Sequence, residues 1–190
     1  LPDALINYLS RLGWSHGNQE VFTRQEMIQH FSMENVTTSA AVFNLEKLQW
    51  LNQQHIQNTA PKDLAGQLEP FLIKEGVLPD NHGLSREEIA KPIPSLNQRA
   101  QTLIEMAQKS AFYFKKNLEF EEKARSKFLN KDIKPHIEKL IAAINNMEDL
   151  EHESLEKLFK RVAEEAGLKL GKLAQPVRVA LTGGTASPGI

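Results

Sequence analysis

The sequence predicts an all-α protein, and three observations lead to this prediction. Apolar residues recur at three- and four-residue spacing along most of the chain, and Ser/Thr-x-x-Glu capping patterns occur at Thr23 and Ser85. No stretch of any length alternates apolar and polar residues as a half-buried strand does. We therefore expect a helical bundle or cage in two units, a linker region at 1–59 and a second helical domain at 60–190.

Three helices are predicted in the first 60 residues. The first spans 2–12, where a first-turn proline precedes leucines at helical spacing and Gly13 ends the pattern. The second begins at the Thr23 capping box and ends near Phe31. The third covers 44–57, where leucines again recur at helical spacing.

The middle of the chain predicts three further helices. One covers 61–72, and Pro70 should bend or interrupt it because proline removes a backbone donor. The capping pattern at Ser85 opens a short helix. Ser95 is predicted to cap a long helix over 96–114, whose apolar residues keep near-helical spacing.

The last part of the chain predicts helices at 133–146, 151–166 and 172–181. Gly167 ends the second of these, and Pro176 lies inside the third. These elements complete the all-α prediction for the 60–190 domain.

The aromatic residues are interpreted as packing groups. Trp14 and Trp50 lie among leucines at helical spacing and are predicted to belong to the core. Tyr113, between two phenylalanines, is likewise predicted to be packed against protein.

The composition is that of an ordinary globular chain of 190 residues, with 41% hydrophobic and 25% charged residues. No apolar run approaches the roughly 18 residues needed to cross a membrane, and the start lacks the features of a signal peptide. The absence of cysteine excludes disulfides and thiolate metal sites and is typical of a cytoplasmic protein. The absence of an initiating methionine indicates a fragment. The net charge of -1 identifies no partner.

The familiar site motifs are missing. The six histidines are never three or four residues apart, and His152-Glu153 has no second histidine to complete a zinc pair. The pair Gly183-Gly184 lacks the following Gly-Lys-Ser/Thr of a phosphate loop and is not a dinucleotide-binding fingerprint. Because no strand is predicted, no serine lies on the strand-to-helix turn that a Gly-x-Ser-x-Gly nucleophile elbow requires. The acidic stretches are typical of solvated helix faces. We predict no catalytic, cofactor or metal site.

Local positive charge is the remaining signal. After Glu165 the chain contains Lys169, Lys172 and Arg178 and no acidic residue, which gives this segment a charge of +3. Such a segment can contact phosphates, and its hydroxyls and loop amides can bind unstacked bases. The alternative is a solvated C-terminal tail with no ligand.

Four blocks of sequence carry a family resemblance. These are LPDALINYLSRLGWSHGNQEVF at 1–22, LEKLQWLNQQHI at 45–56, LNQRAQTL at 96–103 and KLGKLAQPVRVALTG at 169–183. Together and in this order, they resemble the C-terminal part of the bacterial-type glutamyl-tRNA synthetases, a family of class I aminoacyl-tRNA synthetases. The resemblance covers the whole chain.

The resemblance implies that the chain is the tRNA-binding part of a longer protein whose catalytic domain lies elsewhere. Family members activate glutamate with ATP and Mg²⁺ and transfer it to their tRNA, using signatures of the His-Ile-Gly-His and Lys-Met-Ser-Lys-Arg types that this sequence lacks. The chain should therefore be inactive alone and should work with a catalytic domain of the same protein, as a monomer and without a membrane. Residues 1–59 would contact the tRNA stem, and 60–190 would bind the anticodon of a glutamate-accepting tRNA.

The resemblance also assigns residues. The arginine of the family's R-x-x-T-L block falls on Arg99, which would contact the third anticodon base. An arginine at this position resembles the stricter form of the family's enzymes, which charges only glutamate-accepting tRNA. The R-V-A-L-T-G block and the loop after it would lie close to the first two bases; their candidate residues are Arg178, Thr182, Gly183, Ser187, Pro188 and Ile190. To these we add phosphate contacts chosen for charge and nearness in sequence, namely Lys160, Arg161, Lys169 and Lys172.

Two other functions are kept as alternatives. The chain's mixed charge is compatible with a helical protein-interaction module that docks a partner through an amphipathic face. An independent enzyme has no catalytic constellation in its favour. The family continues beyond the Ser-Pro-Gly stretch into a further helical segment, so the resemblance implies that the 60–190 domain is truncated at its C-terminus.

Overall fold

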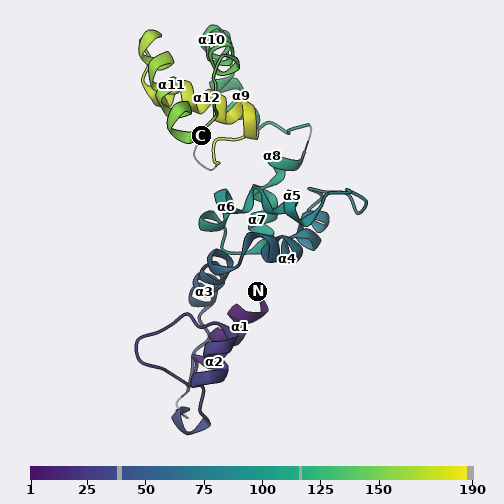
Figure 1. Cartoon of the computed structure of the whole chain (residues 1–190), viewed down its shortest axis with the longest axis vertical. Helices are drawn as coiled ribbons and strands as arrows, with labels where there is room; N and C mark the ends of the chain where they lie inside the picture. Colours follow the sequence, from purple (N-terminus) through teal and green to yellow (C-terminus); the bar gives the residue numbers. More distant parts are fainter. Residues whose placement is uncertain (38–39, 116, 188–190) are drawn as a thin grey trace. The chain divides into compact units, whose positions relative to one another are not determined.

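The computed structural model describes residues 1–37, 40–115 and 117–187. Across these ranges the chain folds into α- and 3-10 helices, with one isolated bridge between His16 and Gln19 and no strand (Figure 1). The all-α prediction is therefore confirmed. The chain forms two compact units, unit 1 at Leu1–Phe114 and unit 2 at Lys115–Ile190.

Unit 1 contains most of the helices, and several are only one or two turns long. In chain order they are α1 (Pro2–Ser10), α2 (Arg24–His30), η1 (Met33–Asn35), α3 (Leu45–Asn58), α4 (Pro61–Lys74), α5 (Arg86–Ala90), α6 (Ile93–Leu96), η2 (Asn97–Arg99), α7 (Leu103–Lys109) and α8 (Ala111–Phe114).

Unit 2 contains α9 (Glu122–Phe128), α10 (Lys134–Asn145), α11 (His152–Glu165) and α12 (Leu170–Thr182). The sequence predicted the last three, but the short helix α9 was missed. Its N-cap residue Glu121 makes no side-chain capping bond, so the sequence pattern at its start is weak.

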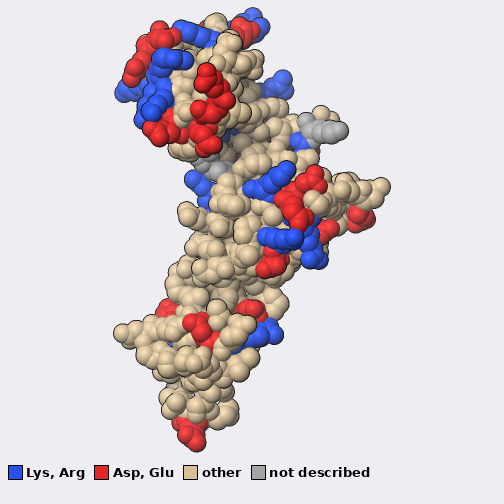
Figure 2. All heavy atoms as spheres, viewed as in Figure 1, with Lys and Arg blue, Asp and Glu red and all other residues tan. Residues whose placement is uncertain are grey.

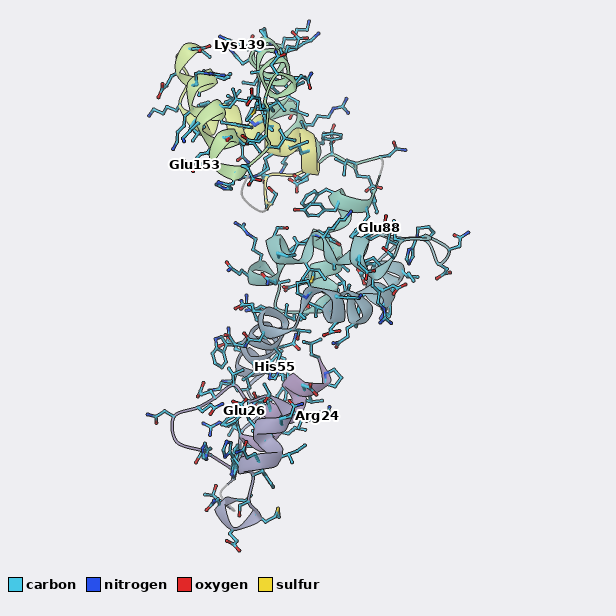
Figure 3. All side chains as sticks on the ribbon, in the orientation of Figure 1. Arg24, Glu26, His55, Glu88, Lys139 and Glu153 are labelled. Atoms are coloured by element: carbon cyan, nitrogen blue, oxygen red, sulfur yellow. The ribbon has the colours of Figure 1, made fainter. Side chains whose placement is uncertain are left out.

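Both predicted capping boxes are present. The hydroxyl of Thr23 accepts the backbone N–H of Glu26, whose carboxylate accepts the N–H of Thr23 at 2.7 Å. Ser85 and Glu88 exchange the same two bonds at the start of α5, and Figure 3 labels both glutamates. These backbone bonds lower the pKa of each carboxyl because they stabilise its charged form.

The predicted long helix at 96–114 is wrong. The chain instead forms four short segments from α6 to α8, and Ser95 lies inside α6 with its hydroxyl donating to the carbonyl of Pro92. The break comes at Thr102, whose side chain accepts the backbone N–H of Glu105 and so caps α7. A second hydroxyl cap within the apolar period ends one helix and starts another.

Pro70 does not interrupt α4, contrary to the expectation of an interruption. The helix is continuous from Pro61 to Lys74, with Leu68 and Leu72 fully buried on either side of the proline. Pro70 itself lies on the exposed face, where water can bind a carbonyl that lacks its amide partner. Burial of the opposite face stabilises the helix enough to offset the missing bond.

The core of unit 1 is formed chiefly by α4, α6 and α7, together with the end of α3. Trp14 packs with Phe22 and Met27 in a smaller cluster, and its 2% exposure confirms it as a core residue. The same prediction for Trp50 is wrong. Its side chain is 37% exposed, and the ammonium of Lys47 lies 5.5 Å from its ring centroid. An exposed indole next to a lysine is stabilised without burial.

Tyr113 is only partly packed. Its ring lies 4.2 Å from that of Phe112, and its hydroxyl lies 2.8 Å from the Ser95 hydroxyl, but 45% of the residue is exposed. The predicted protein contacts are therefore present without full burial.

A buried polar residue, Asn7, connects α1 to α3 and to the chain before α2. Its side-chain oxygen accepts the backbone N–H of Phe22 at 2.9 Å, and its amide donates to the carbonyl of Glu20 at 3.0 Å. Nε2 of His55 lies 3.1 Å from the same oxygen, so this nitrogen carries the proton and donates. Asn7 is fully buried, and each of these groups loses its partner if the amide is removed.

Unit 2 has its own core, formed by α10, α11 and α12 around Leu140, Phe159 and Leu173. An ion pair of 2.6 Å between Lys139 and Glu165 connects α10 to α11 at the surface, and Figure 3 labels the lysine. The stability of the unit depends mainly on the apolar faces, because exposed ion pairs contribute little.

We predict that Asn7→Ala lowers the free energy of unfolding by about 2–4 kcal/mol, because three hydrogen-bonding groups lose their partner in a buried place. Urea unfolding followed by tryptophan fluorescence measures this, since both tryptophans lie in unit 1. Gln108→Ala, which removes an exposed amide of unit 1 bonded to the Glu75 carboxylate, is the control and should cost much less. Equal losses would contradict the role given to Asn7.

We also predict a pH dependence from His55. Burial lowers the pKa of His55 below its usual 6.5, so the unfolded chain binds this proton more readily than the folded one. The contribution is fully present above about pH 6.5 and is lost as pH falls through the folded pKa. The stability difference between the wild type and His55→Gln, which keeps a donor amide, should therefore change between pH 7.5 and 5. If the stability difference between the two proteins does not change with pH, protonation of His55 does not contribute to the stability of the fold.

Candidate nucleic-acid interface

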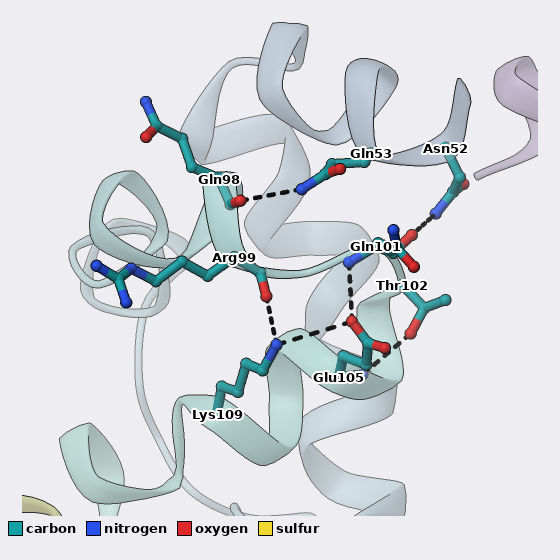
Figure 4. A network of polar contacts seen from close by, with 8 residues as sticks. All are labelled: Asn52, Gln53, Gln98, Arg99, Gln101, Thr102, Glu105 and Lys109. Carbon is teal, nitrogen blue, oxygen red and sulfur yellow. Dashed lines mark hydrogen bonds and ion pairs between the residues drawn. The ribbon is translucent and has the colours of Figure 1, made fainter. Parts of the chain in front are cut away.

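Arg99 ends a 3-10 turn whose backbone is held by side chains from two helices (Figure 4). From α3, Gln53 donates to the carbonyl of Gln98 at 2.9 Å, and Asn52 donates to the carbonyl of Gln101 at 2.6 Å. From α7, the ammonium of Lys109 donates to the carbonyl of Arg99. Three backbone acceptors outside an α-helix are thus satisfied by side chains.

The start of α7 fixes the other side of this turn. The carboxylate of Glu105 accepts the backbone N–H of Gln101 at 2.9 Å and lies 3.9 Å from the ammonium of Lys109. Thr102 caps the helix between them. We call residues 97–102 the Arg99 turn. The Arg99 side chain is exposed and extends away from these contacts in Figure 4.

A second set of contacts lies at the C-terminal end of α12. Nε of Arg178 donates to the hydroxyl of Ser187 at 2.9 Å, and a terminal nitrogen donates to the side-chain oxygen of Gln175 at 2.7 Å. The Gln175 amide in turn donates to the carbonyl of Thr185 at 3.2 Å. Residues 183–187, which we call the terminal loop, are therefore folded back against α12 by Arg178 and Gln175.

The glycines of the terminal loop are required by close packing. Gly183 has a φ of +78°, and a Cβ there would lie 2.2 Å from the carbonyl oxygen of Glu119. The carbonyl of Gly183 accepts the N–H of Glu121 at 2.9 Å. A Cβ on Gly184 would lie 2.8 Å from the Glu121 carboxylate. At position 183 only glycine allows this approach and this conformation together, whereas at position 184 the Glu121 side chain could shift to make room.

This packing changes the electrostatics expected from sequence. The segment after Glu165 has no acidic residue, but the fold brings the carboxylate of Glu121 next to the terminal loop. The loop's surroundings are thus of mixed charge. An anionic ligand would have to approach the loop from the side of Arg178, away from this carboxylate.

The four predicted phosphate contacts lie on exposed positions of unit 2. Lys160 and Arg161 belong to the last half of α11, while Lys169 and Lys172 lie at the start of α12. Lys160 already donates to Glu156 at 2.7 Å, which lowers the pKa of that carboxyl. Figure 2 shows basic and acidic side chains interspersed on the visible face of unit 2.

The predicted site residues therefore fall into three groups. The structure brings Arg178, Thr182, Gly183 and Ser187 together around the terminal loop, with the Thr182 hydroxyl donating to the carbonyl of Arg178 at 2.8 Å. Arg99 belongs to unit 1, and Arg161 and the three predicted lysines belong to other parts of unit 2. The remaining two, Pro188 and Ile190, lie outside the described residues.

Sequence reasoning missed the residues that hold these sites in place. Asn52, Gln53 and Lys109 position the Arg99 turn, and Gln175 positions the terminal loop. The pattern T-L-I-E beginning at Thr102 could have revealed the cap of α7. Nothing in the sequence indicates which amides reach distant carbonyls.

The described ranges hold neither a metal-binding cluster nor a membrane-spanning helix. No group of three or more histidine, aspartate or glutamate side chains there is placed to hold a metal ion. In the same ranges no helix has both the length and the apolar character that crossing a bilayer requires.

Two family models match the sequence. The anticodon binding domain model matches residues 63–190. The model for the catalytic domain of the class I tRNA synthetases for E and Q matches residues 1–50.

Curated relatives match over the whole chain. A glutamate–tRNA ligase of Syntrophobacter fumaroxidans is 48% identical over 190 residues, and one of Geotalea uraniireducens is 46% identical. The match covers 100% of this chain but only 40% of each relative. Among solved structures, a glutamate tRNA ligase from Elizabethkingia meningosepticum superposes on all of this chain with a TM-score of 0.80, at 29% identity and over 37% of its own length.

We predict that Gly183→Ala destabilises unit 2 by more than about 1 kcal/mol, because the methyl group would collide with the Glu119 carbonyl and favour a negative φ. Gly171→Ala is the matched control on the same helix. No atom lies within 4 Å of its added Cβ, so it should be neutral or stabilise by up to about 1 kcal/mol. Thermal unfolding measures both, and equal melting temperatures would contradict the packing described for the terminal loop.

Proposed function

The chain belongs to the family of anticodon binding domains, and on that premise we propose that it reads the anticodon loop of a glutamate-accepting tRNA as part of a glutamate–tRNA ligase. One observation supports this most directly. An exposed arginine, Arg99, projects from a turn whose backbone is fixed from two helices. Unpaired bases expose hydrogen-bonding edges, and the planar guanidinium of an arginine on a fixed turn suits their recognition.

In this proposal Arg99 contacts the third anticodon base. The guanidinium has five N–H donors in a planar fork, which can pair with two acceptors on one base edge. The contacts of Asn52 and Gln53 with the turn reduce the freedom of its backbone before RNA arrives. A preorganised donor loses less entropy on binding than a mobile one.

In the proposal Arg178 also acts in anticodon-loop binding, but it does so by positioning the terminal loop, whereas Arg99 contacts a base directly. Two of the donors of Arg178 hold Ser187 and Gln175, so its first task is to position the terminal loop. Backbone amides and the hydroxyls of Thr182 and Ser187 then meet the first two anticodon bases. We extend this role to Gly183, Pro188 and Ile190, as the family resemblance implies.

The phosphate contacts are the general part of the interface. Lys169 and Lys172 at the start of α12, with Arg161 on α11, would release counterions from the RNA backbone without reading sequence. Lys160 would first have to leave its pair with Glu156, so we expect it to contribute least.

The activity of the whole protein is part of the proposal. The chain spans about 40% of the length of the curated relatives it matches. We propose that the full protein attaches glutamate to tRNA using ATP and Mg²⁺ in the cytoplasm, as a monomer, and that this chain alone does not. The family models at 1–50 and 63–190 support a functional division near residue 60.

An apolar groove in unit 1 favours a second candidate, a helical module that docks a protein. The groove has a volume of about 380 Å³ and is lined by Leu5, Leu45, Leu48 and Ile104, among others. Salt separates the two functions. Phosphate contacts make affinity fall steeply with salt concentration, whereas an apolar protein interface does not have this dependence.

We predict that Arg99→Ala weakens binding of an anticodon stem-loop by about 1–3 kcal/mol and relaxes preference at the third anticodon base. Arg99→Lys should restore charge but not preference, since it lacks the planar fork. Fluorescence anisotropy with stem-loops that differ only at this base measures both effects. Arg24→Ala, which removes another exposed arginine of unit 1, is the control. Unchanged preference in the Arg99 variants would remove this residue from the proposed reader.

A further inference from the structure

A pocket of about 330 Å³ lies within unit 2, where the end of α9 and the start of α10 meet α12. It is separate from the terminal loop. Lys172 lines the pocket, and Arg178 lies six residues later on α12, which places the two side chains about 120° apart around the helix. The volume is within the range of small-ligand sites.

One part of the pocket wall is apolar. Phe128 from α9 and Ile133 line it and are half-buried, while Pro176 from α12 is buried behind them. Phe128 is half-buried, so its position is fixed while part of it stays accessible. Aromatic rings that are held in this way provide stacking surfaces for unpaired bases.

Two lysines line the pocket against a single acidic residue, Asp132. Lys127 and Lys172 are exposed pocket residues, and neither forms an ion pair with an acidic residue in the described part of the chain. The Lys127 ammonium lies 5.1 Å from the ring centroid of Phe128. Other lysines of the unit, such as Lys139 and Lys157, are paired with glutamates at 2.6 Å. Unpaired ammonium groups beside an aromatic wall are suited to a phosphate next to a base.

A hydrogen-bond acceptor is also held at this pocket. The side-chain oxygen of Asn130 accepts the backbone N–H groups of Asp132 and Ile133, both at 3.1 Å, and so fixes the turn that carries Asp132. Asp132 lines the pocket and is exposed. A carboxylate accepts hydrogen bonds from the amino group of a base, so the pocket favours bases that carry one.

We propose that this pocket binds one further unpaired nucleotide of the RNA, with its base on Phe128 and its phosphate at Lys127 and Lys172. The inference rests on the proposed RNA-binding function and assigns it a second contact point, distinct from the terminal loop. Asp132 gives the pocket a preference for a base with an amino group.

The test compares two double variants of this chain that lose the same charge. Lys127→Ala/Lys172→Ala alters the pocket, while Lys134→Ala/Lys157→Ala removes exposed lysines that pair with glutamates elsewhere on unit 2. Each is titrated with an anticodon stem-loop RNA at several salt concentrations. For the pocket variant, the slope of log affinity against log salt should become less steep by about 1.4, the value for two phosphate contacts to a single strand. The control variant should keep the wild-type slope.

A third variant tests the base contact. Phe128→Leu keeps an apolar side chain but removes the ring, and it should weaken stem-loop binding about tenfold with no change in the salt slope. A two-dimensional amide NMR spectrum checks that unit 2 remains folded.

The outcomes separate this inference from the proposed function. If the wild type binds the stem-loop and the pocket variants behave like the control, the pocket and the phosphate contact proposed for Lys172 are both excluded, while the base contacts proposed for Arg99 and the terminal loop stand. If the wild type does not bind the stem-loop at all, both proposals fail. Loss of affinity confined to the pocket variants supports the site.

Discussion

The need to satisfy three backbone carbonyls determines the arrangement around Arg99. Residues 97–102 leave the helical path between α6 and α7, so their carbonyls have no regular partner. Side chains of α3 and α7 provide the donors, with distances of 2.6 and 2.9 Å for the two amides of α3. Because α3 also carries His55, which bonds to the buried Asn7 of α1, the same helix connects the N-terminal part of unit 1 to the Arg99 turn.

Unit 2 fixes its candidate surface by a different means. Two glycines allow the terminal loop to pack against Glu119 and Glu121, and Arg178 with Gln175 holds the loop from the other side. Two of the donors of Arg178 are therefore occupied by Ser187 and Gln175 within the protein. A residue that shapes a loop and a residue that reads a base look alike in sequence, and only their partners distinguish them.

The success of the sequence predictions followed the range of the interactions involved. Capping boxes at Thr23 and Ser85 involve residues three apart, and both were predicted correctly. The helix over 96–114 failed because periodicity alone does not register a hydroxyl cap such as Thr102. The burial of Trp50 failed for a related reason, since helical spacing shows that residues share a face but not whether that face is covered.

The sequence by itself determined the all-α class, most helix positions and the family resemblance, because periodicity, caps and ordered motifs are local properties of the chain. The tertiary structure decided which side chains support those motifs. It brought Asn52 and Gln53 to the Arg99 turn, Glu121 to a segment free of acidic residues, and Lys127 to the same pocket as Lys172. These pairs are separated by 45 residues or more in the sequence, and only the packing of helices brings them together.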